Sequence, residues 1–437
     1  MSFRTCFGIY RPRYSVDVET SGATLHSSVK TVQWTVFSES PSSYAAKVQH
    51  DDTFWTAPSF YMIDTILCVD IGTTSLKAGL ITACGEVVSF CSIPFDEPHD
   101  RFIACSWYDV FLKAAGKLVQ QDVQVTGVCI SGNGPTVVTE SGLTFCWNED
   151  TGAVAELIPD CARSSLFIPK ILSIKNQFPE VWKKHEKLFS GPEYLIYLLT
   201  GQAVTILPEE RFEKAYWNDG MLEACGIRKN LLPPFVKPGD KCGLLYLDDL
   251  QQKGLSFTEN CPVIAGGPDF IVALIGTGTL VSGRLCDRCG SSEGLNFCTD
   301  KVLHGEGLRI LPSVIPGLWN ASYLIPNSGE LSEDERLAEV ERGISCLKQA
   351  ASEAGVQFPC EMAVTGGQTN DVLLLREKSE RLGMKILRPA DEGNKSHFVH
   401  SELMGDACAA CFGLGLHDSL QDAVAQIVRL EPYKGAV

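Results

Sequence analysis

Short apolar runs that end in glycine- and hydroxyl-rich turns recur along the chain after residue 61. The first run, residues 66–69, leads into Asp70 and a turn of Gly, Thr and Ser residues, and an apolar run resumes at residues 76–81. Two extended segments around such a turn predict a β-hairpin. A further strand is expected at residues 87–92.

A helical period follows this hairpin. Residues 109–120 place six apolar side chains on one face, which predicts a helix. Residues 125–131 then read as a strand that ends in a strong turn at residues 132–135. Strand, helix and strand in this order indicate a βαβ unit and an α/β domain. Residues 160–260 are expected to be mainly helical.

The same pattern returns in the second half of the chain. A strand at residues 261–265 ends at Gly266-Gly267-Pro268-Asp269, and a helix is expected to continue to residue 275. Extended segments at 279–281 and 294–298 are expected to flank a loop at 290–292. The remaining pattern predicts a helix at 337–351, a strand at 363–365, a helix ending near 382, a strand at 386–387 and a helix from about 403. Two α/β halves that face each other would form a cleft, a favoured place for a ligand.

Composition and charge narrow the class of protein. The chain has 437 residues, of which 45% are apolar and 21% charged, as in ordinary globular proteins of two or three domains. The formal net charge is −16, so the surface repels nucleic-acid phosphates and anionic lipid. We therefore expect neither a nucleic acid nor a membrane as partner. Phosphates of a nucleotide would have to be held locally.

The first 61 residues differ from the rest. They are rich in Ser, Thr and aromatic residues without a sustained period, and we expect residues 1–61 to be a poorly ordered extension. The first thirty residues lack a continuous apolar core of a signal peptide, and no run reaches the roughly 18–20 apolar residues of a spanning helix. A cytoplasmic location is the expectation.

Cysteine usage supports that location. The 18 cysteines are scattered and mostly lie in apolar runs, as expected of small buried side chains in a reducing compartment. Two C-x-x-C pairs, Cys286/Cys289 and Cys408/Cys411, raise the question of a zinc site. The second pair lies in an alanine-rich helical pattern, which argues against it.

The first turn carries residues suited to a triphosphate. Glycine at Gly72 lets the backbone approach a ligand closely, and the hydroxyls of Thr73, Thr74 and Ser75 are donors. Lys77 adds a positive charge, and Asp70 can hold Mg²⁺, through water. The G-x-x-x-x-G-K pattern of a Walker loop is absent. An ordinary hairpin turn is the alternative interpretation.

Asp269 is the candidate base. It falls at a predicted helix N-terminus, where the helix dipole favours a carboxylate. Such a group can accept a hydroxyl proton during transfer to an electrophile. A simple helix cap is the alternative, and for Asp269 taken alone it is the better one.

The order and spacing of four such segments carry a resemblance. The chain from about Ile63 to Leu416 resembles the FGGY family of carbohydrate kinases, within the actin, hexokinase and Hsp70-like ATPase superfamily. The segments that match it are Asp70-Ile-Gly-Thr-Thr-Ser-Leu-Lys77, Gly266-Gly-Pro-Asp269, Arg288-Cys-Gly290-Ser291-Ser292-Glu293-Gly294, Thr365-Gly-Gly-Gln-Thr-Asn370 and Glu402-Leu-Met-Gly405-Asp406-Ala407.

This resemblance implies two ribonuclease-H-like domains around ATP–Mg²⁺ and a sugar or polyol. The expected limits are 62–260 for the N-terminal domain and 261–437 for a shortened C-terminal domain. Asp269 would be the general base of a xylulokinase-, gluconokinase- or glycerol kinase-like enzyme. Asp70 would serve the metal, and the sugar would contact Asn133, Trp147, Glu149 and Asp269. The nucleotide would contact Gly72, Thr73, Thr74, Ser75, Lys77, Gly290, Ser291, Gly366, Gly367 and Asn370.

Several positions depart from the family pattern. The Trp-x-Asp-x-Arg sugar segment reads Trp147-Asn148-Glu149-Asp150-Thr151, so its arginine is lost, and the glutamine-containing turn reads Gly132-Asn133-Gly134. The stretch before the long helix, residues 320–334, is much shorter than the family's. A nucleotide-binding protein of this fold without transfer activity is therefore a second hypothesis, and an actin-like or chaperone ATPase is a third. Whether the protein forms a homodimer is left open.

Overall fold

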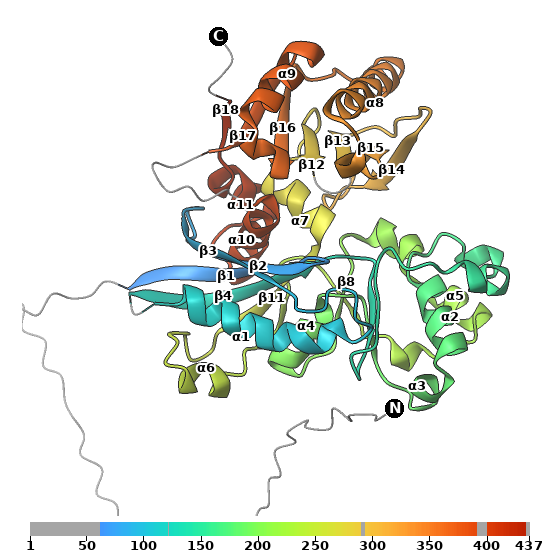
Figure 1. The fold of residues 1–437 in the computed structure, drawn as a ribbon, viewed down its shortest axis with the longest axis vertical. Coiled ribbons are helices and arrows are strands. Elements are labelled where there is room, and N and C mark those ends of the chain that lie inside the picture. Colours follow the sequence, from blue (N-terminus) through green and yellow to red (C-terminus); the bar gives the residue numbers. More distant parts are fainter. Residues whose placement is uncertain (1–61, 121, 290–292, 391–399, 434–437) are drawn as a thin grey trace, which may run out of the picture. The chain divides into compact units, whose positions relative to one another are not determined.

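The computed structural model describes residues 62–120, 122–289, 293–390 and 400–433. The first half of these residues is built around a six-stranded sheet (Figure 1). Its strand order is β10 (Lys241–Leu244), β11 (Pro262–Pro268), β4 (Val123–Gly132), β1 (Ile63–Ile71), β2 (Ser75–Ile81) and β3 (Val87–Pro94). The predicted hairpin is present, because β1 and β2 pair antiparallel around the turn after Asp70.

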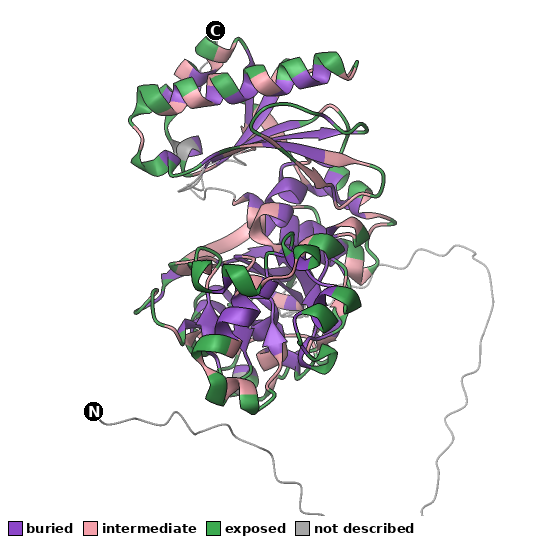
Figure 2. Cartoon of the chain, turned by 90° about the vertical axis from the view of Figure 1, so that its right-hand side faces the viewer, coloured by how far each residue is buried: buried purple, intermediate pink, exposed green. Residues whose placement is uncertain are grey.

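Alternate side chains of this sheet pack in two different hydrophobic cores, one on each face. Leu67, Val69 and Ile71 pack in one cluster with α1 (Trp107–Leu118) and α4 (Glu193–Thr200). On β1, Ile66 and Cys68 point to the other cluster, which contains buried residues of α7 (Asp269–Gly276), α10 (Ser401–Leu414) and α11 (Leu420–Ile427). Because successive side chains of a strand point to opposite faces, helices cover both faces of the sheet. Figure 2 accordingly shows the strands largely buried.

A seven-stranded sheet forms the second half. Its order is β14 (Leu308–Pro312), β15 (Trp319–Ile325), β13 (Glu293–Thr299), β12 (Leu285–Cys289), β16 (Glu361–Gly366), β17 (Lys385–Pro389) and β18 (Leu430–Pro432). Helices α8 (Glu333–Glu353) and α9 (Val372–Leu382) pack on it. A capping box at Ser332 and Glu335 begins α8. On the opposite face, Leu274 of α7 packs with Cys286 and Ala363.

The two sheets repeat one strand arrangement. Three antiparallel strands followed by two parallel ones give β3-β2-β1-β4-β11 in the first sheet and β15-β13-β12-β16-β17 in the second. The duplication expected from the sequence pattern is thus present in the topology.

Smaller elements lie between β4 and β11. They are β5 (Val137–Thr139), β6 (Thr144–Phe145), β7 (Leu188–Phe189), β8 (Thr205–Ile206), β9 (Phe235–Val236), α2 (Ile168–Gln177), α3 (Pro179–Lys183), α5 (Asp219–Ala224) and α6 (Asp248–Gln252). None of the helices in the described ranges is long and apolar enough to cross a membrane.

The structure differs from the expected order of elements between residues 261 and 290. Residues 261–265 were assigned to the second domain, but β11 pairs with β4 and β10 in the first sheet. Residues 279–281 form no strand, and the strand before the 290–292 loop is β12 instead. The predicted extension, residues 1–61, lies outside the described residues. The remaining domain limits stay a prediction.

Candidate active site

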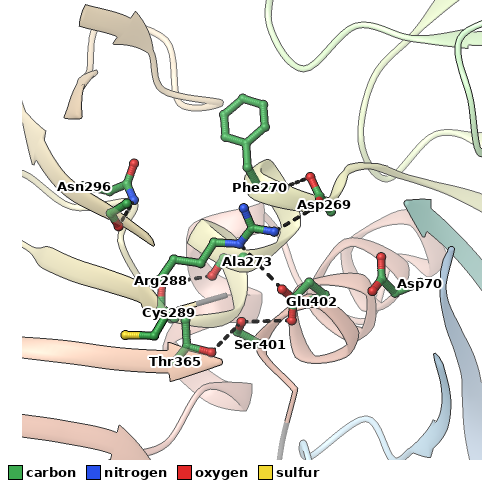
Figure 3. A network of polar contacts seen from close by, with 12 residues as sticks. Asp70, Asp269, Phe270, Ala273, Arg288, Cys289, Asn296, Thr365, Ser401 and Glu402 are labelled. Carbon is green, nitrogen blue, oxygen red and sulfur yellow. Dashed lines mark hydrogen bonds and ion pairs between the residues drawn. The ribbon is translucent and has the colours of Figure 1, made fainter. Parts of the chain in front are cut away.

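The carboxyl ends of three parallel strands bring the first two candidate residues together. Asp70 of β1 pairs in register with Ser131 of β4, and Ser131 pairs with Gly267 of β11. Neighbouring strands lie about 4.8 Å apart, so Asp70 and Gly267 are separated by roughly 10 Å across the sheet. Asp269 begins α7 two residues later. Asp70 and Asp269 therefore lie at the same end of these parallel strands, and both are labelled in Figure 3.

Asp70 is buried and only half satisfied. Its Oδ2 accepts a hydrogen bond from Lys77 Nζ at 3.2 Å, whereas Oδ1 is buried without a hydrogen-bond partner among the described residues. Burial raises the pKa of Asp70 to about 6; Lys77 opposes this shift, and the nearby Glu402 and Asp269 add to it. An orphaned carboxylate oxygen beside other carboxylates suits a hydrated divalent cation. Asp70 thus fits the Mg²⁺ role that the resemblance implies.

Asp269 makes two contacts that a simple helix cap would not combine. Pro268 is the residue before α7, and Asp269 is the first helical residue. Its Oδ1 accepts a hydrogen bond from the N–H of Phe270 at 2.6 Å, and its Oδ2 lies 3.0 Å from Nη2 of Arg288 (Figure 3). Side chains of both Asp269 and Arg288 keep more than a quarter of their surface exposed, at 28% and 29%. The carboxylate is paired and still reachable.

Arg288 connects Asp269 to a second acid on α10. Its Nε lies 3.6 Å from Oε1 of Glu402. Burial opposes ionisation of Glu402, yet the charges of Arg288 and Lys77 lower its pKa below the usual value. The other oxygen of Glu402 accepts a hydrogen bond from Ser401 Oγ at 3.2 Å, and Ser401 Oγ accepts one from Thr365 Oγ1 at 2.8 Å. This network joins β12, β16, α7 and α10 around the two sheets.

Asp406 lies one turn after Glu402 in α10 and contacts the end of β4. Ser131 Oγ donates to its Oδ2 at 2.8 Å. Burial raises the pKa of Asp406 well above the usual value. A Cβ on Gly266 would lie 2.3 Å from Oδ1 of Asp406, so the glycine permits this close approach of α10 to β11. The glycine at position 266 thus has a packing reason.

The tip of the first hairpin is shaped for close approach. The N–H of Gly72 donates to the carbonyl of Ser75 at 2.9 Å, and a Cβ on Gly72 would lie 3.0 Å from that oxygen. The side chains of Thr73 and Ser75 are half-buried, and Thr74 is exposed. Three hydroxyls and Lys77 are therefore gathered within one turn next to Asp70.

The candidate nucleotide residues of the second half lie at the ends of β12 and β16. These strands are parallel and pair Cys289 with Gly366. Gly366 has a φ of +93°, and a Cβ there would lie 2.0 Å from the carbonyl oxygen of Cys289. At Gly367 a Cβ would meet nothing within 4 Å. Gly290 and Ser291 lie outside the described residues, and Asn370 is described only as part of the short 3-10 helix Gly367–Asn370.

The candidate sugar residues approach the first hairpin from the segment after β4. Trp147 Nε1 donates to Thr73 Oγ1 at 3.1 Å, although the ring is 43% exposed. Glu149 pairs with Arg101 Nη2 at 2.5 Å. Asn133 is buried, and its Oδ1 accepts a hydrogen bond from Thr136 at 3.0 Å. The segment that has lost its own arginine is thus paired with an arginine from another part of the chain.

A buried ionic cluster supports the strands that flank residues 290–292. Lys378 Nζ of α9 lies 2.5 Å from Asp287 Oδ2, 2.9 Å from Glu293 Oε1 and 3.6 Å from Cys289 Sγ, and all four residues are buried. The two carboxylates and the thiol form the group found among the described residues that could hold a metal. The ammonium group already lies among them. Cys408 and Cys411 are in α10 and do not belong to this group, which was found among the described residues.

Sequence patterns did not assign a role to several of these residues. Arg288, Glu402 and Asp406 were part of the matched segments, but nothing in their spacing pointed to Asp269 or Asp70. Arg101 and Lys378 have partners 48 and 91 residues away. A basic residue directly before a donor-rich loop, as at Arg288, was the one available signal.

The amino-acid sequence is similar to those of known carbohydrate kinases. The model of the FGGY family of carbohydrate kinases, N-terminal domain, matches residues 161–276. Xylulose kinase of Lactococcus lactis subsp. lactis (strain IL1403) is 22% identical over 287 residues, which cover 58% of this chain and 57% of that protein. Xylulose kinase of Bacillus subtilis (strain 168) is 22% identical over 470 residues, covering 83% and 91%. The chain is thus similar to FGGY carbohydrate kinases, by the family model over residues 161–276 and by these relatives over more of its length.

The fold agrees with this similarity. The crystal structure of Plasmodium falciparum glycerol kinase with ADP matches 85% of this chain and 93% of that chain, with a TM-score of 0.66 and 14% identity. The expected two-domain, actin-like ATPase fold is therefore confirmed. The chain spans little more than half the length of the first curated FGGY relatives it matches, 57% and 54%. Its activity and its substrates are therefore matters for proposal.

Proposed function

We propose that the protein is an ATP-dependent carbohydrate kinase that transfers the γ-phosphoryl group of ATP to a hydroxyl of a sugar, ketose or polyol. The observation that carries the proposal is the common sheet edge of Asp70 and Asp269. One carboxylate has a buried oxygen without a partner, and the other remains accessible beside a guanidinium. Phosphoryl transfer needs a cation site and a proton acceptor close together.

In the proposed reaction Asp269 acts as the general base. The sugar hydroxyl oxygen attacks the γ-phosphorus, and the bond from phosphorus to the β,γ-bridging oxygen breaks. ADP leaves with that electron pair, and the hydroxyl proton passes to the carboxylate of Asp269. A base must lie within about 2.6–3.2 Å of the group it deprotonates. The side chain of Asp269 is 28% exposed, so a sugar hydroxyl would be able to bind within this distance of its carboxylate.

The first hairpin and the ends of β12 and β16 are the proposed nucleotide site. The hydroxyls of Thr73, Thr74 and Ser75 and the ammonium of Lys77 would contact phosphate oxygens, while Gly366, Gly367 and Asn370 would line the adenosine, with Gly290 and Ser291 between. Asp70 would hold Mg²⁺ through water. When bound, Mg²⁺ neutralises phosphate charge. Most of the catalytic effect would come from positioning.

The sugar is proposed to lie between Asp269 and the segment that holds Trp147. The hydrogen bond from Trp147 to Thr73 links this segment to the phosphate hairpin. An exposed indole ring offers an apolar face for a sugar ring, and Asn133 and Glu149 offer polar atoms. Named relatives act on xylulose and, among solved structures, glycerol, which supports ketoses and polyols as the first substrates to test.

A nucleotide-binding protein of this fold without transfer activity is the second candidate. The observation that favours it is the pairing of both sugar-segment and base carboxylates with arginines, Arg101 with Glu149 and Arg288 with Asp269. A sensor needs no base, however, and Asp269, Asp70 and Lys77 are all present. Their joint presence supports the kinase.

The test is a coupled assay of ADP release with ATP–Mg²⁺ over a panel of ketoses, aldonates and polyols. The kinase proposal expects sugar-dependent ADP release with at least one of them. A parallel thermal-shift measurement with a non-hydrolysable ATP analogue separates the candidates. A stability gain with the analogue, but no sugar-dependent ADP release across the panel, would support the sensor and contradict the kinase.

A further inference from the structure

Arg288 places a second fixed cation at the proposed site of transfer. It lies in β12 as the first residue of the segment that resembles the second phosphate loop, and its guanidinium contacts both Asp269 and Glu402. Lys77 is the other cation of this cluster and is bound to Asp70. Two cations and three carboxylates thus form one group of ion pairs, and Figure 3 shows Arg288 with Asp269, Glu402 and Asp70.

The distance from Arg288 to Asp269 limits where a transferred group can lie. A hydroxyl held by Asp269 would be about 3 Å from its carboxylate, and the phosphorus it attacks would lie about 3–3.5 Å beyond the hydroxyl. A guanidinium 3.0 Å from the same carboxylate is within reach of the oxygens on that phosphorus. Arginine carries five N–H donors in a planar fork that matches phosphate oxygens.

We propose that Arg288 is a further catalytic residue, whose guanidinium is shared between Asp269 and the terminal phosphoryl group of a bound nucleoside triphosphate. The inference rests on the proposed function, because it assumes that the γ-phosphate lies beside Asp269. Arg288 then neutralises charge on the oxygens of the phosphoryl group during transfer. In the absence of nucleotide, Asp269 and Glu402 hold the guanidinium in place.

If Arg288 has this role, it should contribute differently to the binding of a nucleoside triphosphate and of a diphosphate. A cation that contacts the terminal phosphoryl group contributes to binding of ATP and contributes little to binding of ADP. Lys77, in the first hairpin, is not proposed to contact the terminal phosphoryl group alone and can contribute to binding of both nucleotides. A merely structural role for Arg288 would affect both nucleotides alike, since it would act through the shape of the site.

The experiment measures the affinity of the full chain for a β,γ-imido ATP analogue and for ADP, each with Mg²⁺, by titration calorimetry. We expect Arg288→Gln to weaken binding of the analogue about tenfold or more, while ADP binding changes less than about twofold. Arg284→Gln is the matched control, because Arg284 precedes the same strand, is 51% exposed and pairs with Glu361. It should leave both affinities unchanged.

Arg288→Lys is the second variant. It keeps the charge but loses the planar fork, and should bind the analogue with intermediate affinity. Equal losses for analogue and ADP, or no loss for either, in a folded variant would overturn the proposal. A wild-type protein that binds the analogue but phosphorylates no sugar would contradict only the proposed activity, and the two affinities would still decide the role of Arg288.

Discussion

Asp269 and Arg288 form an ion pair between the two sheets, with 3.0 Å between Oδ2 and Nη2. Asp269 directly follows β11 of the first sheet, and Arg288 lies in β12, a central strand of the second sheet. Glu402 of α10 joins them through Nε of the same guanidinium. The residues proposed for proton transfer and for phosphate binding are therefore connected by direct contacts.

Gly366 should not tolerate a side chain. Its positive φ and the carbonyl of Cys289 leave no room for a Cβ, so Gly366→Ala should lower the free energy of unfolding by roughly 2–4 kcal/mol. Urea denaturation measures the loss. Gly367→Ala, at the next position, is the matched control because its Cβ would meet nothing within 4 Å. Equal stability of the two variants would show that the turn is not held as described.

Glu193 should make stability fall as the pH rises. Its carboxyl is buried, accepts hydrogen bonds from Ser190 and Ile206, and keeps Oε2 without a partner among the described residues. Burial raises the pKa of Glu193 from 4.5 to about 7. Between these values the folded state binds more protons than the unfolded chain, so the free energy of unfolding decreases with pH and levels off above 7.

Replacing this acid by an amide should remove that dependence. The free energy of unfolding of Glu193→Gln, taken relative to that of wild type, should increase by roughly 3 kcal/mol between pH 4.5 and pH 8. This figure follows from the difference of about two and a half pH units between the folded and unfolded pKa of Glu193. Urea denaturation at several pH values is the measurement, with the exposed Glu180→Gln as control. A difference between wild type and Glu193→Gln that stays constant with pH would contradict the assignment.

Asp70 should determine the acid side of the activity profile. Below about pH 6 its carboxyl is protonated and loses the charge that attracts Mg²⁺. The ratio of wild-type to Asp70→Asn turnover should therefore increase through pH 6 and reach roughly 10–100 at pH 8. Taking the ratio cancels the protonation of ATP itself. Exposed Asp64, on the same strand, is the control position, and a flat ratio for Asp70→Asn would count against its proposed role.

The elements of this fold that depend on local pattern could be predicted from sequence. The hairpin at Asp70 is signalled by two apolar runs around a glycine turn, and α8 by its apolar period. The strand β12 was missed because Leu285–Cys289 contains Asp287 and Arg288 and does not alternate. Asp287 is tolerated in a buried strand only because Lys378 reaches it from α9.

Contacts between distant segments explain the other differences. The strand β11 belongs to the first sheet because it pairs with β4, more than a hundred residues earlier, and no local signal specifies that pairing. The motifs marked Asp70 and Asp269 as residues to examine, and their roles stay a prediction. The partners that surround them, above all Arg288 and Glu402, are brought in by the packing of α7 and α10 between the sheets.

The most direct test of the proposed catalytic base is sugar-dependent ADP release by Asp269→Asn beside the wild-type protein. The amide keeps the size of the side chain but cannot accept the hydroxyl proton. We predict that turnover falls by about 10²–10⁴-fold while the thermal-shift response to the ATP analogue persists. Turnover close to wild type, with the sugar and nucleotide saturating, would show that Asp269 is not the base.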